Sequence, residues 1–257
     1  MDDAWSIVKN ARKRNRIQSE EFISELFYDF IELKGDRIYF DDCTIIGGIA
    51  FYKDIPVTII GFRKGKSFSE IINFKNGMAI PAGYNKALRL IKQAEKFSRP
   101  VIIFVDTPGA YPGEEAEEKG QAYAISLCLK ELSHINTKII SIIISEAYSG
   151  GALALCVSDK LYMLENSCFS ILSPEGYASI LWKNNDYIRA ANEMKLTSED
   201  MFKMGIIDGI VPETDRTSII DSVDELLYYD LFINTFSIEN RLNKLRYMDV
   251  GGVYGKK

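Results

Sequence analysis

Runs of consecutive apolar residues alternate along the chain with segments whose apolar residues recur every three or four positions. The apolar runs VIIFVD (101–106) and KIISIIIS (138–145) are separated by a segment of helical spacing at 121–135, and another such segment, Gly83–Arg99, precedes the first run. A run that is apolar throughout is typical of a strand covered on both faces. The order helix, strand, helix, strand therefore predicts an α/β fold.

The first quarter of the chain shows two other patterns. Apolar residues at helical spacing predict one amphipathic helix over Ile17–Leu33, with Ser19 as its N-cap. Two β-rich runs, Ile45–Tyr52 and Val57–Phe62, flank the turn-prone sequence KDIP and predict a hairpin. We expect a helical entry followed by antiparallel strands.

The last third of the chain continues with short elements. Leu161–Leu164 and Cys168–Leu172 are predicted strands, helical segments are predicted as far as Lys203, and Ser218–Tyr247 has helical periodicity. No linker or low-complexity boundary divides the sequence. We therefore predict one domain over 1–257, with a helical entry at 1–35, a core at 36–215 and a C-terminal helical segment at 216–257.

Composition and charge narrow the class of protein. The chain is 47% hydrophobic and 26% charged, and it has no apolar run near the ~18 residues of a membrane span. Its N-terminus lacks the apolar core of a secretory signal, so we expect a cytoplasmic protein without a membrane segment. The net charge of −5 makes nucleic-acid binding an unfavoured function. The four cysteines form no CxxC pair, which predicts free thiols and no metal site: Cys43, Cys128, Cys156, Cys168.

Cations gather in two short segments. The sequence KNARKRNR (9–16) is interpreted as a solvated helix end in preference to a binding patch. In FRKGKSFSE, Arg63, Lys64 and Lys66 surround a glycine after a strand, where a cation can meet a phosphate or carboxylate, and a solvated loop is an equally good interpretation. Arg89 is interpreted as part of a solvated helix face.

Two loops follow the carboxyl ends of apolar strands, where ligands commonly bind in open α/β sheets. They are DTPGAYPGEEAEEKGQA (106–122) and SEAYSGGALAL (145–155). Peptide N–H groups at Gly150 and Gly151, in the first turn of a predicted helix, could stabilise an oxyanion, or the glycines could serve close packing. The two interpretations stay open. The only histidine, His134, is interpreted as a helix-end residue, and the absence of GxSxG disfavours a hydrolase triad.

Several motifs taken in order resemble the carboxyltransferase α subunit of bacterial acetyl-CoA carboxylase. Two of them, DTPGAYPG and SPEGYASILWK, are highly specific, and the resemblance covers residues from about 4 to 213. The others are FIELKGDR, FDDCTIIGGIA, GYNKALRL and SGGALAL. The resemblance implies a crotonase-like (ClpP-like) superhelix of stacked β-β-α repeats, flanked by helices at both ends of the chain.

The resemblance also implies a reaction and partners. CO₂ would pass from N1′ of carboxybiotin, on a biotin carboxyl carrier protein, to the methyl carbon of acetyl-CoA, giving malonyl-CoA for fatty acid biosynthesis. A β subunit with a zinc ribbon would complete the active site in an α₂β₂ assembly that works with biotin carboxylase. Gly150 and Gly151 would supply the oxyanion hole. The candidate substrate-binding residues are Lys64, Lys66, Arg89, Asp106, Pro108, Gly109, Ala110, Tyr111, Ala147, Tyr148 and Ala152.

Departures from the family pattern leave two alternatives open. Ala147 and Tyr148 stand where many members have glycine, which predicts a narrower mouth of the site, and Lys66 replaces an arginine. One alternative is a diverged biotin-dependent transferase or decarboxylase for another acyl-CoA. The other is a non-catalytic paralogue that acts in assembly.

Overall fold

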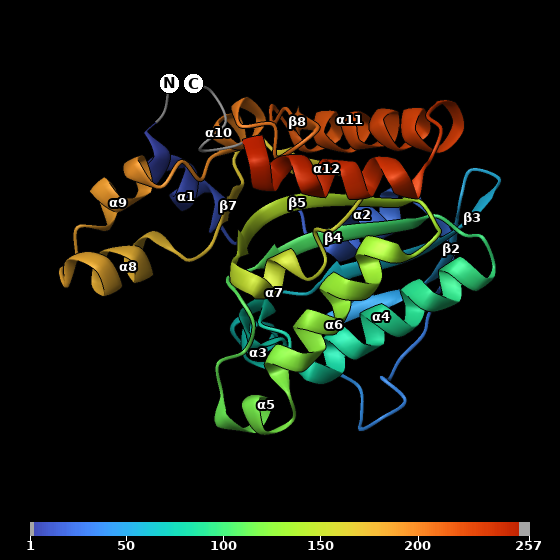
Figure 1. Cartoon of the computed structure of the whole chain (residues 1–257), viewed down its shortest axis with the longest axis horizontal. Helices are drawn as coiled ribbons and strands as arrows, with labels where there is room; N and C mark the ends of the chain where they lie inside the picture. The colour runs from blue at the N-terminus through green and yellow to red at the C-terminus, as the bar shows by residue number, and fades with distance from the viewer. Residues whose placement is uncertain (1–2, 252–257) are drawn as a thin grey trace.

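The computed structural model describes residues 3–251, so the ends of the predicted entry and C-terminal segments, 1–2 and 252–257, lie outside it (Figure 1). A single sheet runs through this part of the chain in the order β1-β2-β3-β4-β5-β6-β8, with β7 paired to β5. β1, β2 and β3 are antiparallel, and all other pairings are parallel. The strands are β1 (Tyr28–Glu32), β2 (Ile45–Tyr52), β3 (Ile55–Phe62), β4 (Val101–Thr107), β5 (Ile139–Tyr148), β6 (Lys160–Leu164), β7 (Cys168–Ser170) and β8 (Gly209–Val211).

Helices connect the strands and cover both faces of the sheet (Figure 1). The α-helices are α1 (Ala4–Ala11), α2 (Ser19–Leu26), α3 (Phe68–Asn73), α4 (Pro81–Lys96), α5 (Glu114–Glu118), α6 (Gln121–His134), α7 (Ser149–Leu153), α8 (Pro174–Tyr177), α9 (Tyr187–Glu193), α10 (Ser198–Lys203), α11 (Arg216–Tyr228) and α12 (Ile238–Gly251). A 3₁₀ turn, η1 (Lys75–Gly77), and two π-helical turns, η2 (Ala178–Trp182) and η3 (Tyr229–Ile233), complete the described elements.

The core follows from the two-residue period of the buried strands. In β4, Val101, Ile103 and Val105 face a cluster that includes α4 and α6, whereas Ile102 and Phe104 face one built with α2 and α11. All seven residues of β4 and all ten of β5 are buried. Apolar side chains are therefore required on both faces, which explains why these strands lack the alternation of a half-exposed sheet.

The hairpin and the β4–β5 region were predicted correctly, but the single helix over Ile17–Leu33 is wrong. α2 ends at Leu26, Phe27 is extended, and Tyr28–Glu32 form β1 along the edge of β2. The aromatic and β-branched residues of this stretch favour a strand once a partner edge is available. The predicted N-cap is also wrong, because Gln18 holds that position and the Ser19 hydroxyl donates a buried hydrogen bond to the Phe62 carbonyl.

A buried cation helps to attach the C-terminal helix to the body of the protein. The Arg241 side chain in α12 is fully buried, and its guanidinium donates to the backbone carbonyls of Leu132, Ile135 and Thr137. It also pairs with Asp159 at 2.5 Å. Arg241 thereby satisfies carbonyl groups at the end of α6 that the helix itself leaves free.

Candidate functional site

The two loops predicted to carry chemistry meet at the carboxyl edge of the sheet. β4 and β5 are parallel neighbours, and their ends pair at Thr107 and Ala147. The Thr107 hydroxyl donates to the Gly109 carbonyl at 2.7 Å and accepts from the Gly109 N–H at 3.1 Å, which holds the first loop in a fixed turn. Gly109 has φ +138°, a conformation that favours glycine.

The two adjacent glycines have different surroundings. A Cβ at Gly151 would lie 2.3 Å from the amide nitrogen of Ala110 and 2.7 Å from the carbonyl carbon of Gly109, so this position allows the two loops to pack in contact. A Cβ at Gly150 would meet only the Ile125 side chain, at an ordinary 3.4 Å. Close packing therefore explains Gly151 but not Gly150.

The glycines occupy the first turn of α7, which starts at Ser149. Peptide N–H groups in a first turn have no acceptor within the helix and lie at the positive end of its dipole. Ser149 has a positive φ of 62°, an uncommon value for a residue with a side chain, so the turn from β5 into α7 is sharp. This geometry provides backbone donors at the end of a buried strand.

A pocket of about 620 Å³ opens beside this turn. Ser149, Gly150 and Leu153 form one wall, and the remaining walls are mostly apolar side chains from β7 and from the segment around α10. Those remaining lining residues are Phe169, Ser170, Ile171, Met194, Lys195, Met201, Met204 and Ile206. Sequence analysis missed them because they lie 19 to 56 residues after Gly150 in short elements without a recognisable pattern.

Ala147 and Tyr148 lie in the core, away from the lining of that pocket. Both side chains are fully buried, and Tyr148 packs in a small cluster that includes Val8 of α1 and Leu196. Its hydroxyl has no hydrogen-bond partner of normal geometry within residues 3–251, and burial raises the pKa of Tyr148. The tyrosine side chain packs beneath α1. It therefore does not narrow the mouth of the pocket, contrary to the prediction.

A buried group of charges lies under the two loops. The Lys64 ammonium contacts Glu146 at 2.6 Å and Asp106 at 3.1 Å, and Glu146 also accepts from Arg12 at 2.7 Å. Burial by itself would raise the pKa of Glu146, but Lys64 and Arg12 outweigh it and lower that pKa. Burial likewise opposes the charge of Lys64, and the two carboxylates raise its pKa in spite of it. Glu146 and Lys64 are therefore both ionised near neutral pH.

The other predicted cations have contacts within the protein. Lys66 pairs with Glu21 at 2.5 Å. Arg89 donates to the carbonyls of Leu33 and Gly35 at 2.9 and 3.0 Å, so it holds the segment after β1 and is not a freely solvated helix residue. A role of either cation in binding phosphate stays a prediction.

The remaining candidates form the first loop and the start of α7. Pro108 and Ala110 are half-buried, and Ala152 is fully buried. Tyr111 packs against the cluster formed by Ile80 and its neighbours, and its N–H donates to the Ala79 carbonyl at 3.1 Å. Of these residues Ala152 belongs to α7 itself and Ala110 approaches the glycine turn at Gly151, whereas Tyr111 lies against the Ile80 cluster.

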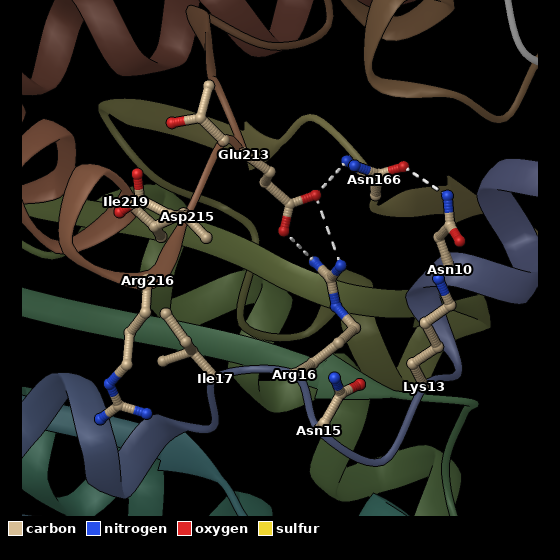
Figure 2. A pocket seen from close by; sticks show the side chains of 11 residues that line it. Asn10, Lys13, Asn15, Arg16, Ile17, Asn166, Glu213, Asp215, Arg216 and Ile219 are labelled. Carbon is tan, nitrogen blue, oxygen red and sulfur yellow. Dashed lines mark hydrogen bonds and ion pairs between the residues drawn. The ribbon is translucent and has the colours of Figure 1, made fainter.

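The basic segment 9–16 is only partly solvated, which corrects its interpretation as a solvated helix end. Arg16 and Glu213 form an ion pair at 2.7 Å in the lining of a second pocket of about 440 Å³, with Asn166 and Asn10 beside them (Figure 2). Arg16 also donates to the Ile144 carbonyl of β5 at 2.7 Å. The segment is therefore attached to the sheet, while Lys13, Arg14 and Asn15 are exposed.

Several other observations concern the described residues as a whole. The four cysteines are free thiols, as predicted. His134 lies in the last turn of α6, where its ring contacts the Lys130 carbonyl at 3.0 Å. Between residues 3 and 251, no helix is long and apolar enough to cross a membrane. No group of three His, Cys, Asp or Glu suited to a metal ion occurs in that part of the chain either.

The fold defines a structural class, that of the crotonase-like proteins. The structure superimposes on transcarboxylase 12S with a TM-score of 0.71, at 16% identity, over 90% of this chain and 45% of that one. It superimposes on the β subunit of Pseudomonas aeruginosa geranyl-CoA carboxylase with a TM-score of 0.68, at 17% identity, over 90% and 44%. At such identities the likeness shows the fold, and the predicted crotonase-like fold is confirmed.

The sequence itself identifies the family. Residues 2–245 match the family described as acetyl co-enzyme A carboxylase carboxyltransferase-like. The α subunit of the acetyl-coenzyme A carboxylase carboxyl transferase of Clostridium beijerinckii is 49% identical over 97% of this chain and 96% of that protein. The α subunit from Listeria monocytogenes is 47% identical over 95% and 79%. The chain belongs to the family of acetyl-CoA carboxylase carboxyltransferase α subunits.

Proposed function

We propose that this chain is one half of a carboxyltransferase that moves CO₂ from carboxybiotin to acetyl-CoA and yields malonyl-CoA. Membership of the α-subunit family supports the reaction. The observation that carries the proposal is the glycine turn at the start of α7, which forms one wall of the 620 Å³ pocket. A pocket with backbone donors on one wall and apolar side chains on the others suits the head group of biotin, in which a ureido oxygen accepts hydrogen bonds and the fused thioether ring is apolar.

The residues present fit the biotin ring. In the proposed mechanism, the N–H groups of Gly150 and Gly151 stabilise negative charge on the ureido oxygen, and the bare Cα of Gly150 lets the ring approach them. Bound carboxybiotin would supply the CO₂ and, once relieved of it, a nitrogen base for the methyl proton of acetyl-CoA. The apolar side chains of Leu153, Phe169 and Ile171 would exclude water once a second chain covers the exposed rim, which would strengthen the hydrogen bonds to the oxygen.

The loop 106–111 supports this turn in the proposed site. Gly109 and Ala110 contact Gly151 directly, and the Tyr84 hydroxyl donates to the Gly151 carbonyl at 3.1 Å. We propose that Pro108, Ala110 and Tyr111 shape the floor beneath the substrate. No metal is assigned to the described residues in this scheme.

The partner subunit is part of the proposal. At the rim of the pocket the Ile171 side chain is 74% exposed, and Leu153 and Met204 are also exposed. Apolar side chains gathered at the mouth of a pocket are typical of a surface that a second chain covers. We propose a zinc-ribbon β subunit in an α₂β₂ assembly, which holds the thioester enolate and receives biotin from the carrier protein after biotin carboxylase has carboxylated it.

The test is reconstitution. Malonyl-CoA and free biotin are incubated with the purified chain, with a zinc-ribbon β subunit, and with both, and acetyl-CoA formation is measured. Turnover is expected only with both chains. Full turnover by this chain alone would contradict the two-subunit proposal.

The alternative of another acyl-CoA loses one of its reasons in the structure, because Tyr148 lies in the core and not at the pocket. Competition among acetyl-, propionyl- and glutaconyl-CoA measures the preference directly. We expect acetyl-CoA to be the best acceptor.

A further inference from the structure

The N-terminal helix packs against a lobe that projects from the sheet. In Figure 1, α1 lies beside α8 and α9 at one end of the molecule. The Trp5 and Tyr187 rings are 4.6 Å apart, and the Ala4 N–H donates to the Asn192 side chain at 3.1 Å. α1 and this lobe, residues 174–193, are therefore in direct contact.

One guanidinium joins this lobe to the sheet. Arg12, the residue that ends α1, donates from Nη1 and Nη2 to the two carboxylate oxygens of Glu175 in α8, at 2.6 and 3.1 Å. Its Nε donates to Glu146 Oε1 at 2.7 Å. The planar guanidinium can bind both oxygens of one carboxylate with its two Nη groups and a second carboxylate with Nε, whereas a lysine ammonium has no such fixed fork of donors.

The Glu146 carboxylate lies immediately before the glycine turn. Its side chain is 4% exposed, and its backbone belongs to the last three residues of β5. Its second oxygen accepts from Lys64, which also contacts Asp106 at the end of β4. A continuous chain of charges thus runs from α8 through Arg12 to the ends of both strands that carry the site loops.

The different burial of the two carboxylates decides which of them is affected more by the loss of Arg12. Removing one partner of a buried ion pair is costly because the remaining charge stays desolvated. Glu175 is 41% exposed and can find water when Arg12 is lost, whereas Glu146 cannot. Loss of Arg12 therefore acts mainly on Glu146 and on the backbone of β5.

We propose that Arg12 is a positioning residue for carboxyl transfer, fixing the end of β5 so that the glycine turn meets the substrate and tying that turn to the α8 lobe. The inference rests on the proposed function and adds to it a residue far from the pocket in sequence. Arg16 also donates to the Ile144 carbonyl of β5. The backbone at Arg12 is therefore held by α1 before it and by Arg16 after it.

The dependence of the transfer rate on pH distinguishes a positioning role of Arg12 from a role in folding alone. The groups that face Glu146 are Arg12, Lys64, Asp106, Tyr148 and Cys168. Without Arg12 only Lys64 remains to lower the pKa of Glu146 against burial, so that pKa rises. Protonation of Glu146 then begins at higher pH, and the acid limb of the rate profile moves upward.

The experiment uses the chain in complex with its β subunit, with malonyl-CoA and free biotin as substrates. The variants are Arg12→Met, Arg12→Lys and Glu175→Gln, and Arg14→Met is the matched control because Arg14 is exposed and outside the charge chain. Arg12→Met is expected to lower kcat by about 10-fold or more with KM for malonyl-CoA nearly unchanged. Arg12→Lys and Glu175→Gln keep a cation beside Glu146. We therefore expect each of them to lower kcat by a similar factor, smaller than that of Arg12→Met, and to leave the acid limb of the rate profile unshifted.

Three results would overturn the inference. They are a wild-type kcat and pH profile in Arg12→Met, an equal loss in the Arg14→Met control, and a loss that only follows the folded fraction measured by thermal melting. Glu175→Gln keeps the test valid if Arg12→Met folds poorly. If the wild-type complex itself fails to convert malonyl-CoA, the proposed function fails and not the role of Arg12.

Discussion

The contrast between Gly150 and Gly151 gives a quantitative prediction. Alanine at 151 places its Cβ 2.3 Å from the Ala110 nitrogen, about 1 Å closer than van der Waals contact, and the obstacle is backbone that cannot rotate away. Overpacking of this kind costs roughly 1–3 kcal/mol. For a chain of this length, 1 kcal/mol corresponds to about 2–4 °C in Tm, so Gly151→Ala is expected to melt roughly 2–12 °C lower.

Gly150→Ala is the matched variant. Its Cβ meets only Ile125 at 3.4 Å, and alanine is favoured over glycine in a helix by roughly 0.5–1 kcal/mol. We expect an unchanged or slightly higher Tm. The new methyl group stands at the pocket wall, so turnover of malonyl-CoA with biotin in the reconstituted complex is expected to fall by about 10-fold or more.

Scanning calorimetry and the carboxyl-transfer assay check the two variants together. If Gly151→Ala melted at the wild-type temperature, the close approach of the two loops would be refuted. If Gly150→Ala kept full turnover in the reconstituted complex, Gly150 would not border the reacting group. A bulky residue at 151 is a poor probe of catalysis, since the structure predicts that it disturbs the fold first.

Three further predictions concern the core. Tyr148→Phe removes a buried hydroxyl without a normal partner, so unfolding by urea is expected to show a gain of up to about 1 kcal/mol with unchanged acyl-CoA preference. Arg241→Met leaves buried carbonyls unpaired and should cost about 3 kcal/mol in the same assay. The pKa of Glu146 is lowered by Lys64 and Arg12 in the fold, so its contribution to stability is complete above about pH 4–5 and is lost as pH falls further; a flat urea midpoint down to pH 3 would contradict this.

The strands that carry the site could be predicted from sequence because their burial is two-sided. β4 and β5 are apolar throughout, and any parallel order of such strands brings their carboxyl ends to one edge. β1 could not be predicted, because its residues satisfy a helical period as well as a strand and only the free edge of β2 decides between them. Periodicity describes one element at a time, whereas pairing depends on another.

The candidate site was predictable from sequence only where its residues are neighbours along the chain. The glycine turn directly follows its strand, so Gly150 and Gly151 could be identified. The pocket walls from Phe169 and from Met201 converge on it through folding, and nothing local in their sequence marks them. The direction of Tyr148 was likewise decided by α1, which lies about 140 residues earlier.

The attachment of α12 through Arg241 bears on how the protein folds during synthesis. The carbonyls of Leu132, Ile135 and Thr137 lack this guanidinium until a residue 104 positions after Thr137 has left the ribosome. Unpaired buried carbonyls are unfavourable, so the end of α6 and the entry to β5 are expected to stay open until then. Because the carboxyl end of β5 leads into the glycine turn, we expect the site to become ordered late, after Arg241 has joined the fold.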